Sequence, residues 1–118
     1  MKKVILVLVS LICITSNAYA AEAKVVGKFI KTLTTKDNLY GGCMAEIDVS
    51  VAASGLNCPA NGWVTFSCSG DFVSKEEAMR MFDSAQMSLA LNKRAVLKVT
   101  DLQKHNGFCM VTRIDILK

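Results

Sequence analysis

Apolar and polar residues alternate along two stretches of the chain, and this period of two predicts half-buried strands. The first stretch puts on its inward side Cys43, Ala45, Ile47, Val49 and Val51. The second runs from Trp63 to Ser69, with Val64, Phe66 and Cys68 inward. An earlier run from Lys24 to Thr35 is rich in β-branched and apolar residues and predicts a further strand. Gly27 lies early in this run and indicates a bulge or a sharp bend.

A different period, three and four residues, begins after Ser74 and predicts a helix with one buried stripe. The stripe consists of Ala78, Met81, Phe82, Ala85 and Leu89. Ser74 and Glu77 have the spacing of a capping box, so the helix should start at this serine. Asn92 and Lys93 suit its end, because asparagine tolerates the left-handed conformation and lysine is favourable near the last carbonyls.

Two more strands are predicted after the helix, from Ala95 to Thr100 and from Phe108 to Ile116. They are joined by the loop Asp101 to Gly107, in which Asn106-Gly107 can supply the positive φ angles of a tight hairpin turn. Strict alternation in the last strand predicts an inward face formed by Phe108, Met110, Ile114 and Ile116. The same alternation places Cys109 on the opposite side.

The predicted order is β-β-β-α-β-β, so the fold class is mainly β with one helix. An OB-fold-like five-stranded barrel has this order, with its helix between the third and fourth strands. An antiparallel sheet backed by one helix is the main alternative.

The first 20 residues have the three parts of a secretory signal peptide. Lys2 and Lys3 precede an apolar run from Val4 to Ile14, and a small-x-small site, Ala18-Tyr19-Ala20, follows. The run is too short to span a bilayer, and no membrane insertion is expected. We therefore expect an exported protein, periplasmic or secreted, with a signal peptide at 1–20 and a single domain at 21–118.

Charge and motifs exclude several classes of function. The formal charge is +4, and removal of Lys2 and Lys3 leaves 12 − 10 = +2, too little to predict a nucleic-acid partner. The chain has no glycine-rich phosphate loop and no HExxH zinc motif. Its single histidine, His105, has no serine in a recognisable catalytic motif to act with. We expect neither enzymatic activity nor a cofactor.

Four cysteines remain after residue 20, an even number that predicts two disulfides in an exported chain. No pair has the close spacing of a structural zinc site, so no metal is expected. In an OB-fold, the second and third strands form a hairpin, which would bring Cys43 to Cys68. The third and fifth strands run parallel, which would bring the loop before Trp63 to the last strand and pair Cys58 with Cys109.

The helix "SKEEAMRMFDSAQMSLALNKRA" and the final strand "CMVTRIDIL", within residues 74–117, resemble the B subunits of AB5 bacterial toxins of the cholera-toxin type. The resemblance covers most of residues 21–118 in layout and implies a ring-forming, sugar-binding module. The chain shows no glycan-binding motif of that family, and it has two predicted bridges where the family type has one. Receptor residues are therefore not carried over.

The helix has a second face that is less polar than a solvated face normally is, formed by Met79, Asp83, Gln86, Met87 and Ala90. In toxin-like rings this helix packs against neighbouring subunits, so homo-oligomerisation through the face is one interpretation. Scattered surface methionine and alanine residues are the other.

Candidate ligand-binding residues come from the loops and strands that OB-folds use for saccharides and oligonucleotides. They are Lys36, Asn38, Tyr40, Trp63, Gln103, Lys104, His105 and Asn106. Their amides and charged groups can bond sugar hydroxyls, and an aromatic ring can stack on a sugar face. One interpretation of Trp63 is a platform on which a sugar stacks, or part of an interface. The other is that it covers the Cys58–Cys109 bridge or the end of the barrel.

The sequence thus favours a non-enzymatic binding module with a glycan as its ligand. The alternative is a periplasmic structural or inhibitory protein that binds another protein through Trp63 and the last hairpin. A disulfide-bonded enzyme is a third and weaker interpretation.

Overall fold

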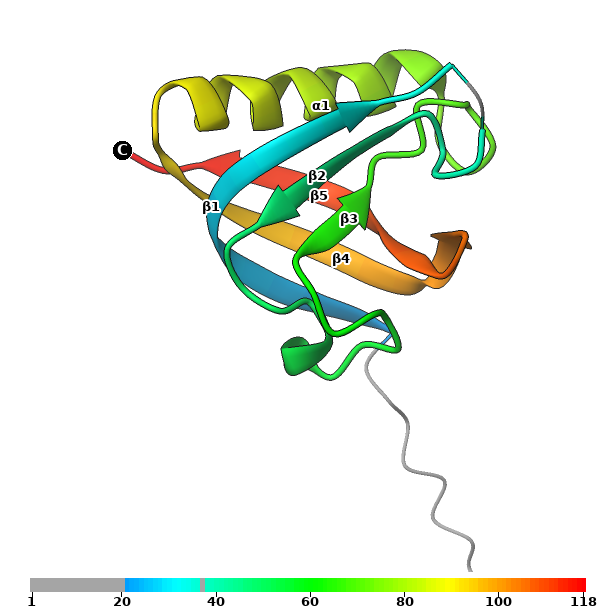
Figure 1. Ribbon diagram of the computed structural model, residues 1–118, viewed down its shortest axis with the longest axis horizontal. Coiled ribbons are helices and arrows are strands. Elements are labelled where there is room, and N and C mark those ends of the chain that lie inside the picture. Colours follow the sequence, from blue (N-terminus) through cyan, green and yellow to red (C-terminus); the bar gives the residue numbers. More distant parts are fainter. Residues whose placement is uncertain (1–20, 37) are drawn as a thin grey trace, which may run out of the picture.

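A computed structural model describes residues 21–36 and 38–118, and the predicted signal peptide lies outside these residues. The elements follow in the order β1 (Glu22–Thr34), β2 (Cys43–Ile47), the short 3₁₀ helix η1 (Ala52–Ser54), β3 (Trp63–Thr65), α1 (Lys75–Ala90), β4 (Arg94–His105) and β5 (Phe108–Ile116). The five strands form one closed barrel, with α1 lying across one end of it (Figure 1). The predicted mainly β class with one helix and the OB-fold-like barrel are confirmed.

The barrel closes because β1 is long enough to pair with two neighbours. Residues 22–28 of β1 pair with β4, and residues 29–34 pair with β2. Strand β3 joins β2 to β5, and the β3–β5 pair is the only parallel one in the described sheet, at Thr65 and Met110. The resulting order, β1-β2-β3-β5-β4, leaves no free edge along the ring of described strands.

Strand β1 contains a bulge, as Gly27 indicated, but the bulge lies at Ile30 and not at Gly27 itself. The register with β2 shifts between Phe29 and Lys31, which makes Ile30 an extra residue, 57% exposed. Gly27 itself lies close to β2, since a Cβ atom there would meet the side chains of Asp48 and Ile47.

The helix is built as the sequence predicted. The Ser74 hydroxyl accepts a hydrogen bond from the Glu77 amide at 3.2 Å, which caps the first turn. Asn92 has φ 52° at the far end, where the Lys93 amide bonds the Ser88 carbonyl, as in a Schellman motif. The predicted stripe packs on the barrel, with Ala78, Phe82 and Ala85 buried and Met81 and Leu89 partly buried.

Strands β2 and β3 are shorter than the alternation predicted. Strand β2 ends at Ile47. Asp48 still lies beside Lys28, whose amide donates to the Asp48 carboxylate, and Val49 is exposed. Strand β3 ends at Thr65, because the chain turns sharply at Ser67, whose φ is 59°. The inward parity nevertheless holds for Val51 and Phe66, both in the core.

Strands β4 and β5 meet at a two-residue turn, so the predicted loop from Asp101 to Gly107 is wrong in its extent. Asn106 and Gly107 alone make the turn, with φ angles of 50° and 85°. Residues 101–103 form a bulge, because Thr100 pairs with Met110 whereas Lys104 pairs with Cys109.

The predicted facing of β5 is wrong in its first half. Cys109 and Val111 are fully buried in the core, whereas Phe108 and Met110 lie on the outer side. The register shifts where Lys98 pairs with Arg113 and Val99 with Val111, so Thr112 is an extra residue. This bulge reverses the parity, and Ile114 packs against the core as predicted.

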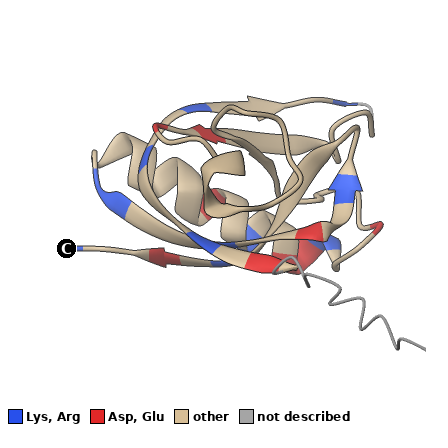
Figure 2. Cartoon of the chain, turned by 90° about the horizontal axis from the view of Figure 1, so that it is seen from below, with Lys and Arg blue, Asp and Glu red and all other residues tan. Residues whose placement is uncertain are grey.

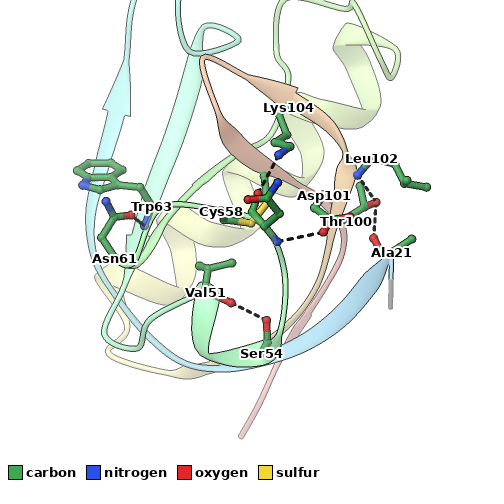
Figure 3. The surroundings of a disulfide bond; sticks show 12 residues. Ala21, Val51, Ser54, Cys58, Asn61, Trp63, Thr100, Asp101, Leu102 and Lys104 are labelled. Atoms are coloured by element: carbon green, nitrogen blue, oxygen red, sulfur yellow. Dashed lines mark hydrogen bonds between the residues drawn. A yellow bond between two sulfur atoms is a disulfide. The ribbon is translucent and has the colours of Figure 1, made fainter. Parts of the chain in front are cut away.

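The structure contains both predicted disulfides, Cys43–Cys68 and Cys58–Cys109, with Cα atoms 5.6 Å and 5.8 Å apart. Around the second bridge, Asp101 and Lys104 bond the chain just before Cys58 (Figure 3). The Asp101 carboxylate accepts from the Asn57 amide at 3.0 Å, and the Lys104 ammonium donates to the Asn57 carbonyl at 2.8 Å. Two disulfides in so small a chain indicate an oxidising compartment.

None of the helices described in residues 21–36 and 38–118 is long and apolar enough to cross a membrane.

Candidate functional site

The outer surface of β1, β2 and β3 carries a row of three side chains of different chemistry. Lys31 pairs with Glu46, and Glu46 pairs with Trp63, so the three residues lie side by side on one face. The bulge at Ile30 sets this arrangement, because without the extra residue Ile30 would stand opposite Glu46. A cation, a carboxylate and an indole ring are thereby placed in a row, each one strand spacing from the next.

Trp63 supplies the aromatic ring of this row. Its ring is half-buried, and the Lys31 ammonium lies 5.7 Å from the ring centroid, within reach of a cation–π contact. The Asn61 side chain accepts a hydrogen bond from the Trp63 amide at 3.1 Å and fixes the start of β3. Figure 3 shows the ring directed away from the Cys58 disulfide, so Trp63 does not cover that bridge.

The Glu46 carboxylate has no hydrogen bond or ion pair with any residue in the described part of the chain. It is half-buried, next to the indole ring on one side and Lys31 on the other. A carboxylate without such a partner can accept a hydrogen bond from a hydroxyl group of a ligand.

A second row, adjacent to the first, is mostly apolar and is bordered by two aromatic rings. It consists of Leu33, Met44, Thr65 and Met110. Tyr40 and Phe108 lie beside Leu33 and Met44, with their ring centroids 5.8 Å apart, edge to face. Between these rings and Trp63 is a small hollow of about 180 Å³, lined by Leu33, Tyr40, Met44, Trp63 and Phe108.

The structure brings two of the predicted ligand residues together at this hollow, Tyr40 and Trp63. It places Lys36 and Asn38 elsewhere, in a separate hollow beside the start of α1 that also includes Lys75 and Met79. Asp37, between them, lies outside the described residues.

The predicted residues of the last hairpin do not converge on the hollow either. Gln103 and Lys104 belong to β4, and the Lys104 ammonium is engaged by the Asn57 carbonyl. Asn106 is exposed at the turn. The hairpin residues therefore lie outside the candidate site.

His105 is buried rather than presented to a ligand. Only 8% of the residue is exposed, its Nε2 atom lies 2.8 Å from the Ser67 hydroxyl, and its ring contacts Phe72 at 4.8 Å between centroids. Ser67 is fully buried, so we interpret the pair as structural and not as a nucleophile and its base. The contact ties β4 to the segment after β3.

Replacing His105 with alanine should therefore lower stability. The change leaves the buried Ser67 hydroxyl without its side-chain partner and removes the contact with Phe72, which together should cost about 2–3 kcal/mol. Urea unfolding followed by circular dichroism measures this free energy.

Gln103→Ala, in the same strand, is the matched control and should cost less than about 0.5 kcal/mol. If the His105 and Gln103 variants were equally stable, the Ser67–His105 contact would not hold the segment in place.

Sequence reasoning missed Lys31, Glu46 and Phe108 as site residues. The outward position of Glu46 was readable from the alternation of β2. The positions of Lys31 and Phe108 depend on bulges in β1 and β5, which have no local signal in the sequence. In the described residues, no group of three histidine, cysteine or acidic side chains is placed to hold a metal ion.

Comparison with protein-family models, curated proteins and solved structures finds no match to this chain. No relative therefore assigns a role to the β1–β2–β3 face, and its own geometry indicates what it can bind.

Proposed function

We propose that this protein is an exported, non-enzymatic binding domain that recognises a carbohydrate on the outer face of β1, β2 and β3. The observation that supports this most directly is the row Lys31–Glu46–Trp63 beside the aromatic hollow. This is the strand face with which OB-folds commonly bind oligosaccharides.

The chemistry of the row fits one sugar ring. The aliphatic side of a sugar can stack on Trp63, because an aromatic face favours contact with C–H groups. Its hydroxyl groups can donate to the Glu46 carboxylate and accept from the Lys31 ammonium. At about 180 Å³ the hollow is smaller than the roughly 300–1,000 Å³ of sites for larger small molecules, so a single terminal residue is the expected unit.

The two disulfides support an extracytoplasmic location, because such bonds persist in oxidising compartments. Together with the predicted signal peptide, they support export to the periplasm or beyond it. A glycan on a cell surface would then be within reach of the domain.

The resemblance to AB5 toxin B subunits adds a proposal about assembly, namely a ring formed through the second face of α1. The residues predicted for this face include two exposed methionines, Met79 at 44% and Met87 at 59%. Two exposed methionines on one helix are a suitable apolar centre for a contact between copies.

If α1 forms that contact, Met79→Glu combined with Met87→Glu should convert an oligomer into a monomer, because two carboxylates would be buried without partners. Sedimentation velocity at high micromolar concentration measures the change. Leu102→Glu adds a charge at another exposed apolar position and should leave the assembly intact. A wild-type protein that sediments as a monomer would rule out the ring.

A glycan array tests the sugar proposal. The oxidised domain, residues 21–118, should bind a related set of glycans, and the Trp63→Ala variant should lose all of them. Binding that survives in this variant would place the site elsewhere. No binding by the oxidised wild type would contradict the sugar assignment.

A protein ligand is the second candidate. Leu102, near the last hairpin, is 75% exposed, the largest fraction among the big apolar side chains of the described chain. Contiguous exposed apolar patches mark protein-binding surfaces, and Leu102 would contribute to such a patch. This candidate predicts an array without hits and a partner whose capture is lost in Leu102→Ser and Trp63→Ala.

A further inference from the structure

A second outer face, formed by β1, β4 and β5, carries cations directly opposite one another. Lys24 pairs with Lys98, and Lys98 pairs with Arg113, so three positive groups form a row across three strands. Further along the same pair of strands, Lys28 stands opposite Arg94. In Figure 2, basic segments follow one another along the strands at the lower edge of the molecule, with acidic segments among them.

This arrangement is unfavourable for the free protein, because like charges on directly opposite residues repel. Neighbouring acidic residues compensate this repulsion only in part. Glu22 lies 3.7 Å from the Lys98 ammonium and also accepts from the Thr112 hydroxyl, and Asp115 pairs with Arg113 at 2.9 Å. Both pairs are largely solvent-exposed and therefore weak.

The face carries the net charge of the domain. Its five cations, less Glu22, Asp115 and the adjacent Asp48, give 5 − 3 = +2. Residues 21–118 contain 12 basic and 10 acidic residues and also sum to +2, so the remainder of the domain is neutral. The net positive charge of the domain thus comes from this face.

The row borders a groove of about 550 Å³ lined by Lys24, Val26, Val96, Lys98, Arg113 and Asp115. Val26 and Val96 stand opposite each other and form an aliphatic floor between the charged side chains. The described lining of the groove contains no aromatic ring on which a nucleic-acid base could stack, and three cations in a row are few for a nucleic-acid backbone.

We infer that this groove binds a saccharide that carries sulfate or phosphate ester groups. The row Lys24–Lys98–Arg113 would pair with the ester oxygens, and the valine floor would contact the aliphatic side of the sugar. The groove lies on β1, β4 and β5, whereas Trp63 lies on the β1–β2–β3 face. The two sites are therefore independent of each other.

Titration calorimetry with dextran sulfate, dextran phosphate and unsubstituted dextran tests the inference, at about 0.05 M and about 0.15 M salt. Dextran sulfate should bind, unsubstituted dextran should not, and binding should weaken as salt rises. The variant K24Q/K98Q/R113Q should lose about tenfold or more in affinity. A control with the same change in net charge, K36Q/K75Q/K118Q, should lose less than about twofold.

The relative affinities of the probes identify the ester. Tighter binding of dextran sulfate than of dextran phosphate identifies sulfated sugars as its source, and the reverse identifies phosphorylated ones. Equal weakening in both triple variants would show an effect of net charge alone and overturn the inference. So would tighter binding of duplex DNA or of vesicles containing anionic lipid than of either saccharide-type probe. Trp63→Ala should leave all of these affinities unchanged, which separates this test from that of the Trp63 face.

Discussion

Removing the Cys58–Cys109 disulfide by substitution of both cysteines with alanine should lower the free energy of unfolding by about 4 kcal/mol. The bridge joins positions 51 residues apart, so it restricts the unfolded chain more than the Cys43–Cys68 bridge, which spans 25. In the chain-entropy model the shorter bridge contributes about 3.5 kcal/mol. A loss of this size is a large fraction of the roughly 5–15 kcal/mol that holds a typical domain folded.

The location of Cys109 increases the effect. The residue is fully buried in the core, and the loop that carries Cys58 is otherwise held to the barrel by Asp101 and Lys104. Thermal unfolding monitored by circular dichroism should show a midpoint lowered by roughly 15–30 °C, or no cooperative transition.

The C43A/C68A variant is the matched comparison and should remain the more stable of the two. A larger loss in C43A/C68A than in C58A/C109A would show that loop length does not decide the contributions, and that local packing does.

Replacing Trp63 with alanine should weaken binding of a glycan identified on the array by about 30-fold or more. Central aromatic residues at binding sites typically contribute about 2 kcal/mol or more, which corresponds to that ratio. The fold should persist, because the ring lies on the outer face and outside the buried core. Calorimetric titration of the oxidised domain measures the affinity.

Two further variants separate stacking from hydrogen bonding. Trp63→Phe keeps a flat ring and should lose less affinity than Trp63→Ala. Glu46→Gln keeps the shape of the side chain but removes its charge, and it should weaken binding by about tenfold if the carboxylate accepts from a hydroxyl. An affinity that Glu46→Gln leaves unchanged would remove Glu46 from the site, whatever the effect of Trp63.

The sequence predicted those features of the fold that depend on local rules. The helix start after Ser74 follows from capping, its termination before Asn92 from the left-handed conformation, and the hairpin turn at Asn106-Gly107 from its φ angles. The cysteine pairing followed from the strand order of the barrel, and both bonds are present.

The features that the sequence did not predict depend on bulges. An extra residue at Thr112 reverses the facing of β5, so Cys109 is inside the core although simple alternation places it outside. In the same way, the bulge at Ile30 moves Lys31 onto the face of Trp63. A bulge adds one residue without a characteristic composition, and its position is decided by how the barrel closes.

His105 shows a second limit of sequence reasoning. A lone histidine next to a turn and a lysine has the composition of a ligand-binding hairpin loop. Its burial against Ser67 and Phe72 depends on the chain after β3 folding back at the positive φ of Ser67. No spacing between residues 67 and 105 indicates that contact.

Trp63 is the single tryptophan of the chain, so its fluorescence reports on the proposed site alone. Titration of the oxidised domain with a glycan selected on the array should change the Trp63 emission saturably, with a shift to shorter wavelength as the ring loses water. The midpoint should agree with the calorimetric affinity. Calorimetric binding that leaves the emission unchanged would contradict the proposal that the β1–β2–β3 face holds the sugar.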